Sequence, residues 1–144
     1  MRAPWCSLNT IPASGSVWST SSIPLVRART VSLTVRLTFG AQINDDTTAY
    51  VYYSPDGNNW DTIHYTSFVI AFTVSTTKQR TVLLDIPEHG YLMVKLTNGS
   101  DADTVTQPIL WYTIQSWEEI GAEAIESILL RALKLQKQEE TGQI

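Results

Sequence analysis

The chain has 144 residues, of which 43% are hydrophobic and 17% charged, and its formal net charge is −4. This length allows a hydrophobic core without disulfides, and the hydrophobic fraction excludes a disordered polyelectrolyte. The acidic balance argues against nucleic acid as the main partner. No apolar run is long enough for a membrane span, and none follows the first residues as a signal peptide requires. A single cysteine, Cys6, excludes a disulfide framework, and we expect an inert thiol there.

Residues 1–27 predict an extended N-terminal arm with at most one irregular strand, at residues 17–25. Prolines recur in this segment, serine and threonine are dense, and the apolar residues show no helical period. Trp5 and Trp18 both lie here, and a large aromatic ring is costly to leave in water. We therefore expect both tryptophans to dock on a surface, either of the same chain or of a partner.

Residues 28–116 predict a mainly β domain, an antiparallel β-sandwich. Apolar and polar residues alternate from Val31 to Phe39, which is the pattern of a half-buried strand. Further strands are expected at residues 49–54, 68–72, 81–86, 91–97 and 105–114, with turn sequences such as Pro55-Asp56-Gly57-Asn58 between them. Short strands with turns about every ten residues are typical of sandwiches of the jelly-roll or immunoglobulin-like type.

Serine and threonine fill the outward positions of these strands, as at Ser32, Thr34 and Thr38. Their abundance has two explanations. It reflects either the β-propensity of these residues or an uncharged sheet face that is easily desolvated for contacts with another protein. The sequence leaves both explanations open.

Residues 117–140 predict a C-terminal amphipathic α-helix. Ser116-Trp117-Glu118-Glu119 has the S-x-x-E pattern of a capping box, and acidic residues precede basic ones, which complements the helix dipole. The apolar stripe consists of Ile125, Ile128, Leu129, Ala132 and Leu135. Because the strands of a sandwich already fill its two inner faces, we expect this stripe to pack on a second copy or a partner. Packing on its own sandwich is the alternative.

No motif predicts an enzyme or a metal site. The two histidines, His64 and His89, match no metal-ligand spacing. No nucleophile elbow, phosphate-binding loop or dinucleotide fingerprint occurs, and the loop aspartates match no calcium loop. A hydrolase would have only Asp56 and Asp61 as acid candidates. We therefore expect no catalytic residue, no cofactor and no metal.

The segment Tyr52–Trp60 reads Y-Y-S-P-D-G-N-N-W. It is similar to a strand–turn–tryptophan element of discoidin-like sandwiches. The likeness implies a structural role, in which Asp56-Gly57 forms the turn and Trp60 folds back over the hairpin.

The whole chain resembles the small structural proteins of tailed-virus particles, such as capsid decoration, neck and tail-completion subunits. The features in common are the arm, the Ser/Thr-rich sandwich, the strand Trp111-Tyr112-Thr113-Ile114 and the short acidic-then-basic helix. The resemblance implies a non-enzymatic subunit of a virion assembled in the host cytoplasm, which forms a trimer or ring and clamps other particle subunits. The residues expected at these contacts are Trp5, Trp18, Ile125, Ile128, Leu129, Ala132 and Leu135.

A carbohydrate- or surface-binding sandwich is the alternative function. Aromatic side chains would then stack on sugar rings, and loop carboxylates and amides would bond to sugar hydroxyls. The candidates are Asp56, Asn58, Trp60 and Tyr65, with Trp18 as a further stacking ring. Aromatic rings that stay exposed in the folded protein would favour this alternative.

Overall fold

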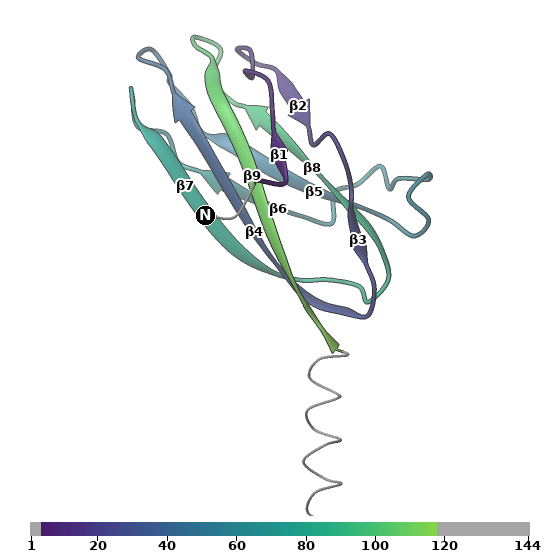
Figure 1. Ribbon diagram of the computed structural model, residues 1–144. Coiled ribbons are helices and arrows are strands. Elements are labelled where there is room, and N and C mark those ends of the chain that lie inside the picture. The colour runs from purple at the N-terminus through teal and green to yellow at the C-terminus, as the bar shows by residue number, and fades with distance from the viewer. Residues whose placement is uncertain (1–3, 118–144) are drawn as a thin grey trace, which may run out of the picture.

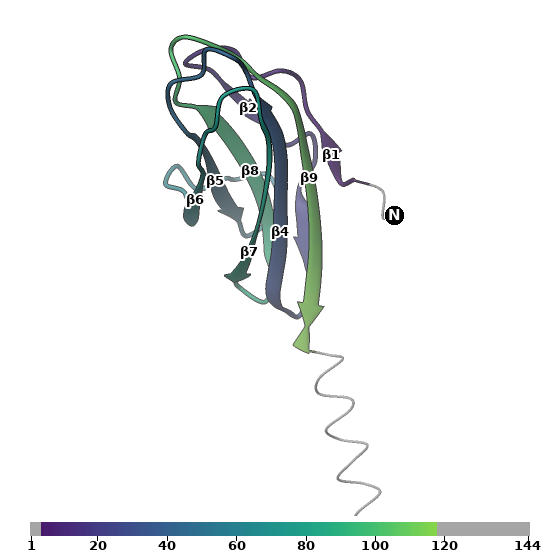
Figure 2. The same cartoon turned by 90° about the vertical axis from the view of Figure 1, so that its left-hand side faces the viewer.

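A computed structural model describes residues 4–117, and these form two antiparallel sheets that face each other (Figures 1 and 2). The expectation of a mainly β sandwich is therefore confirmed. The expected C-terminal helix lies outside the described residues except for Trp117, which directly follows the last strand. The strands are β1 (Cys6–Ser7), β2 (Ser16–Trp18), β3 (Ile23–Leu25), β4 (Ala28–Phe39), β5 (Thr47–Ser54), β6 (Thr66–Ile70), β7 (Thr77–Asp85), β8 (Gly90–Asn98) and β9 (Val105–Ser116).

The two sheets draw their strands from along the whole described chain. One sheet has the order β1-β9-β4-β7, and the other has the order β2-β8-β5-β6. Strand β3 also pairs with β8, next to β2 along the same edge. Most connections cross from one sheet to the other, so residues far apart in sequence become neighbours on one face.

The core lies between the sheets and follows the alternation seen in the sequence. In β4 every second residue from Val31 to Phe39 is buried, and the residues between them face outward. In β8, Leu92, Val94 and Leu96 are fully buried and face β4 from the other sheet. This two-residue period leaves one outer face on each sheet, which is where side chains are free for other contacts.

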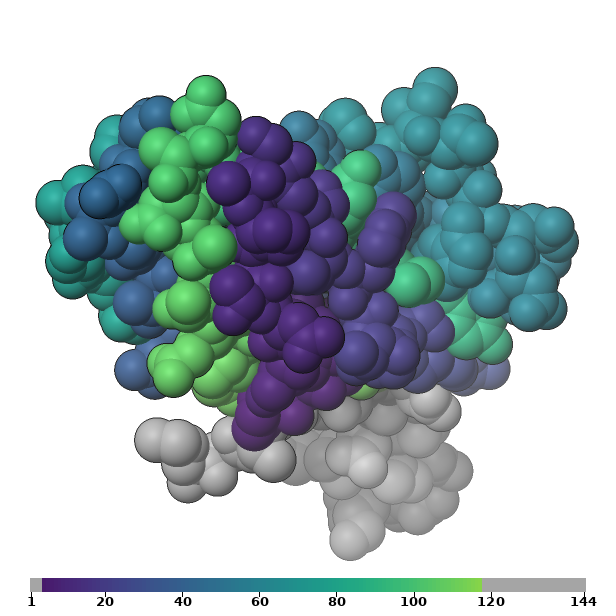
Figure 3. Space-filling view, turned by 90° about the horizontal axis from the view of Figure 1, so that it is seen from above, coloured from purple at the N-terminus to yellow at the C-terminus, as the bar shows by residue number. Residues whose placement is uncertain are grey.

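Most of the segment that we expected to be an extended arm belongs to the sandwich. Strand β1 pairs with β9, and β2 and β3 pair with β8. Figure 3 shows this purple segment lying beside the green β9. Cys6, Ile11 and Ile23 are buried in the core. Proline and serine misled the prediction because short edge strands tolerate them: Pro24 lies in β3, and an edge strand does not need every backbone N–H.

Candidate functional site

Aromatic side chains gather on the outer face of the sheet that contains β2, β8 and β5. Tyr50 and Tyr52 lie two residues apart in β5 and so point to the same side, while Ala49 and Val51 between and beside them are buried. The neighbouring strands and the loop before β6 add three further residues. We call this set the aromatic surface, and it consists of Trp18, Tyr50, Tyr52, His64 and Lys95.

Strand register brings the aromatic surface together. Lys95 in β8 pairs with Trp18 on one side and with Tyr50 on the other. Residues directly opposite in antiparallel strands share a face, so these three side chains form a row across three strands. His64 reaches the same face from the loop that connects β5 to β6.

The rings are in contact at aromatic packing distances. The ring centroids of Trp18 and Tyr52 are 5.0 Å apart with an interplanar angle of 49°. The His64 ring lies edge-on to Tyr50, at a centroid distance of 5.0 Å, and to Tyr52, at 6.2 Å. The Nζ atom of Lys95 lies 5.4 Å from the ring centroid of Trp18, 5.2 Å from that of Tyr50 and 5.4 Å from that of Tyr52. These are cation–π distances.

The aromatic surface is open to solvent and bordered by hydroxyl groups. The Trp18 side chain is 46% exposed. One row further along the strands, Thr97 pairs with Ser16 of β2 and Thr48 of β5. The hydroxyls of Ser16 and Thr97 are hydrogen-bonded to each other at 2.9 Å. This part of the sheet therefore presents the exposed Trp18 ring and the half-buried Tyr50 and Tyr52 rings next to neutral hydroxyl groups.

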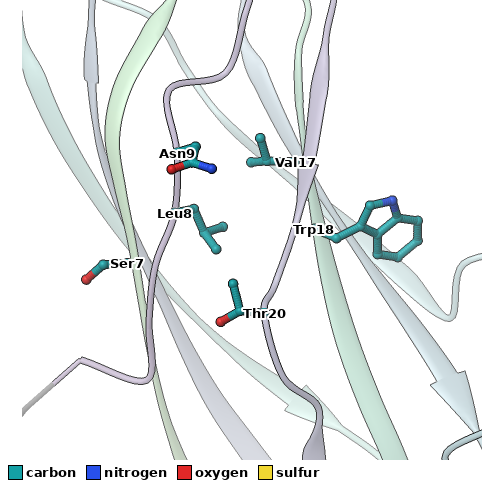
Figure 4. A pocket seen from close by; sticks show the side chains of 6 residues that line it. All are labelled: Ser7, Leu8, Asn9, Val17, Trp18 and Thr20. Carbon is teal, nitrogen blue, oxygen red and sulfur yellow. The ribbon is translucent and has the colours of Figure 1, made fainter.

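An open cavity of about 260 Å³ lies beside β2, lined by Ser7, Leu8, Asn9, Val17, Trp18 and Thr20 (Figure 4). The side chains of Leu8, Val17 and Thr20 point into it, whereas the indole of Trp18 points away from it (Figure 4). The cavity is therefore lined partly by Val17 and Thr20, which lie close to Trp18 in the sequence. The Trp18 ring itself belongs to the outer face.

Asp56, a predicted sugar-binding residue, is engaged by its own turn. Its Oδ1 accepts hydrogen bonds from the backbone N–H groups of Asn58 at 2.9 Å and Asn59 at 2.8 Å, and its Oδ2 accepts one from Asn59 Nδ2. These hydrogen bonds, led by the backbone ones, hold the pKa of the Asp56 carboxyl well below its usual range. The carboxylate therefore stabilises the turn.

The Asp56 turn predicts a pH dependence of stability. A carboxyl whose pKa is lower in the folded state stabilises the fold above its unfolded pKa of about 3.9 and loses this effect as pH falls. We expect Asp56→Asn to lower the urea unfolding midpoint at pH 7, and we expect the difference from wild type to shrink steadily below about pH 4. Urea titrations of both proteins between pH 7 and 2.5 measure this. The pKa of Asp103 is also lowered, but Asp103 is present in both proteins, so its contribution cancels in the difference between them. A difference that stays constant over this range contradicts the assignment.

Of the other residues predicted to bind sugar, Trp18 belongs to the aromatic surface, whereas Asn58, Trp60 and Tyr65 are not among the side chains that define it. Asn58 is exposed at the tip of the turn, and Trp60 is half-buried. Tyr65 is 46% exposed, and its hydroxyl donates a hydrogen bond to the carbonyl oxygen of Asp85 in β7 at 2.8 Å. Asp56 is therefore bonded within its own turn, and Tyr65 is bonded to the end of β7.

The residues predicted to contact partners do not form one surface in the structure. Trp5 docks on its own chain: its ring lies edge-on to Tyr112 at 5.2 Å, and its Nε1 donates a hydrogen bond to Ser21 Oγ at 2.8 Å. Trp18 stays exposed on the aromatic surface. The predicted stripe of Ile125, Ile128, Leu129, Ala132 and Leu135 lies outside the described residues.

Four residues of the aromatic surface were not among the predicted site residues: Tyr50, Tyr52, His64 and Lys95. The two-residue spacing of the tyrosines was a usable signal, because it places both rings on one face. The position of Lys95 between them and Trp18 depends on strand pairing, for which the sequence carries no signal.

The described residues contain no group of three or more His, Cys, Asp or Glu side chains that could hold a metal ion. A helix capable of spanning a membrane is also absent from residues 4–117.

Comparison with protein-family models finds no match, and comparison with curated proteins finds none either. Three solved structures are similar at low identity. A family 35 carbohydrate binding module from an environmental isolate is 12% identical over 81% of this chain and 77% of that chain, with a TM-score of 0.45. Family 16 Carbohydrate Binding Module-2 is 14% identical over 74% of this chain and 72% of that chain, with a TM-score of 0.41.

The third is a family GH115 4-O-methyl-alpha-glucuronidase with specificity for decorated arabinogalactans. It is 13% identical over 77% of this chain, with a TM-score of 0.44. The match spans only 18% of the glucuronidase chain. None of these three is described as a virus-particle protein. At these identities and TM-scores, the comparisons assign no function to this chain.

Proposed function

We propose that this protein is a non-enzymatic carbohydrate-binding β-sandwich that holds saccharide rings on the aromatic surface. The observation that carries the proposal is the set of contacting rings on one outer sheet face, with Trp18 46% exposed. Rings of this size are usually buried when they have only a structural role, as Trp5 is in part. The exposed Trp18 and His64 rings, in contact with the half-buried Tyr50 and Tyr52 rings, support a binding role.

The chemistry of a sugar ring matches this surface. A pyranose has a face of C–H groups with partial positive charge, and the face of an aromatic ring carries partial negative charge. Stacking the two also removes apolar area from water, which contributes roughly 25 cal/mol per Å². The hydroxyls of Ser16 and Thr97 lie next to the rings and can exchange hydrogen bonds with the hydroxyl rim of the sugar.

The size of the aromatic surface favours an oligosaccharide. Three rings, those of Trp18, Tyr50 and Tyr52, come from strands on the two sides of β8. The centroids of Trp18 and Tyr52 are 5.0 Å apart, so more than one ring is available to a bound chain of sugars. Trp18 and Tyr52 are also inclined to each other by 49°, so they offer two differently oriented faces to successive sugar units.

A glycan array probed with the full chain tests the proposal, followed by isothermal titration calorimetry on the saccharides that bind. We expect saturable binding to at least one saccharide class, with affinity increasing from the monosaccharide to the tetrasaccharide because more rings are contacted. If no saccharide binds at millimolar concentration, the proposal is wrong.

The particle-subunit function expected from the sequence remains a separate proposal. Its predicted self-association depends on the apolar stripe at residues 125–135, which lies outside the described residues. Within residues 4–117, Trp5 is already docked on its own chain, so it does not support a contact with a partner.

A further inference from the structure

Lys95 occupies the centre of the aromatic surface. Its Nζ atom is 5.2 to 5.4 Å from three ring centroids, those of Trp18, Tyr50 and Tyr52. Among residues 4–117 Lys95 forms these cation–π contacts and no ion pair. Lys95 is half-buried as a residue, and its ammonium group is positioned by the three rings.

The outward strand positions around Lys95 carry no carboxylate. The chain as a whole is acidic, with 14 aspartates and glutamates against 10 lysines and arginines. Nevertheless, the positions of β2, β5 and β8 that point outward carry only hydroxyl, aromatic, thioether and ammonium groups. The described acidic residues lie in loops and at strand ends. Because of Lys95, the aromatic surface is a positively charged patch on a protein of net negative charge.

This charge changes which saccharide the surface selects. Bare aromatic faces repel an anion, because the face of each ring is negative. The Lys95 ammonium group offsets the negative faces of three rings and has three N–H donors for an anionic oxygen. A ligand that stacks on Trp18 can therefore place a carboxylate or sulfate on Lys95 Nζ with a charge-assisted hydrogen bond.

We infer that the aromatic surface binds saccharides that carry an anionic group, and that Lys95 is the residue that recognises this group. The inference rests on the proposed carbohydrate-binding function and specifies its ligand class. The same chemistry describes a uronic acid and a sulfated sugar, so the experiment has one arm for each.

The test compares a charged and a neutral probe built on the same saccharide backbone, using the full chain and titration calorimetry. The carboxylate arm uses oligogalacturonate and its methyl ester, and the sulfate arm uses dextran sulfate and dextran. We expect the anionic member of at least one pair to bind about tenfold or more tightly than its neutral member, and added salt to weaken that binding. The arm that shows the preference identifies the anionic group.

Three variants separate recognition by Lys95 from a structural role. Lys95→Met keeps the aliphatic stem over the rings and removes the charge. It is expected to lose roughly 10- to 100-fold in affinity for the anionic probe, the size of one charged hydrogen bond, and to lose clearly less for the neutral probe. Lys95→Arg is expected to retain the preference. Arg29→Met is the control, because the Arg29 guanidinium lies 5.1 Å over the Trp117 ring, away from the aromatic surface.

The two possible failures are distinguishable. Equal binding of the charged and neutral members of both pairs overturns the inference and leaves the carbohydrate-binding function standing. Equal losses of Lys95→Met for charged and neutral probes also overturn it, because Lys95 then only supports the rings. If no member of either pair binds, the inference fails, and the proposed function fails with it only when the glycan array is negative too.

Discussion

Replacing Trp18 by alanine is expected to weaken oligosaccharide binding by about 30-fold or more and to leave the fold intact. A tryptophan at the centre of a contact typically contributes 2 kcal/mol or more, which corresponds to that ratio. Trp18 is 46% exposed and, on the aromatic surface, contacts Tyr52 and the Lys95 ammonium group. Truncating such a surface side chain costs little folding free energy. Calorimetric titration gives the affinity, and thermal unfolding gives the stability.

The chain contains a closely matched control for Trp18. Trp117 is also 46% exposed and also carries a cation over its ring, that of Arg29 at 5.1 Å. It directly follows the end of β9, and β9 belongs to the other sheet, away from β2, β5 and β8 (Figure 1). Trp117→Ala should therefore bind the oligosaccharide as wild type does. If both variants lose affinity equally, or if neither does, the binding site is elsewhere.

Much of the fold could be predicted because β-strands have a short and local signal. The alternation from Val31 to Phe39 identifies β4, and the turn sequence at Pro55-Asp56-Gly57 identifies the end of β5. Each of these signals depends on neighbouring residues only. The pairing of β4 with both β7 and β9 connects residues that are up to about 90 positions apart, and no local pattern encodes it.

The candidate site was predicted only in part for the same reason. The sequence shows that Tyr50 and Tyr52 share a face. It also predicts that Trp18 docks on a surface, without showing which one. It does not show that β8 lies between them and carries Lys95 at the matching register. The prediction instead favoured loop residues such as Asp56, whose carboxylate is engaged by the backbone of its own turn.

Leu33→Ala is expected to have the largest effect on stability, and Leu83→Ala almost none. Leu33 in β4 is 1% exposed, and Leu83 in the adjacent β7 is 72% exposed. The two strands are paired, with Leu33 opposite Val82 and Ser32 opposite Leu83, so the leucines point to opposite sides of one sheet. Removing the buried side chain leaves a cavity between the sheets, which typically costs about 2–5 kcal/mol. The exposed substitution should stay within about 0.5 kcal/mol.

Equilibrium unfolding in urea measures both effects, and the saccharide affinity of the folded protein should be the same in both variants. Neither leucine touches the aromatic surface, so stability and binding respond to different residues: Leu33 for the first and Trp18 for the second. A large loss at Leu83 would contradict this division. It would mean that the outer face of β7 is covered in solution, by a second copy of the chain or by another partner.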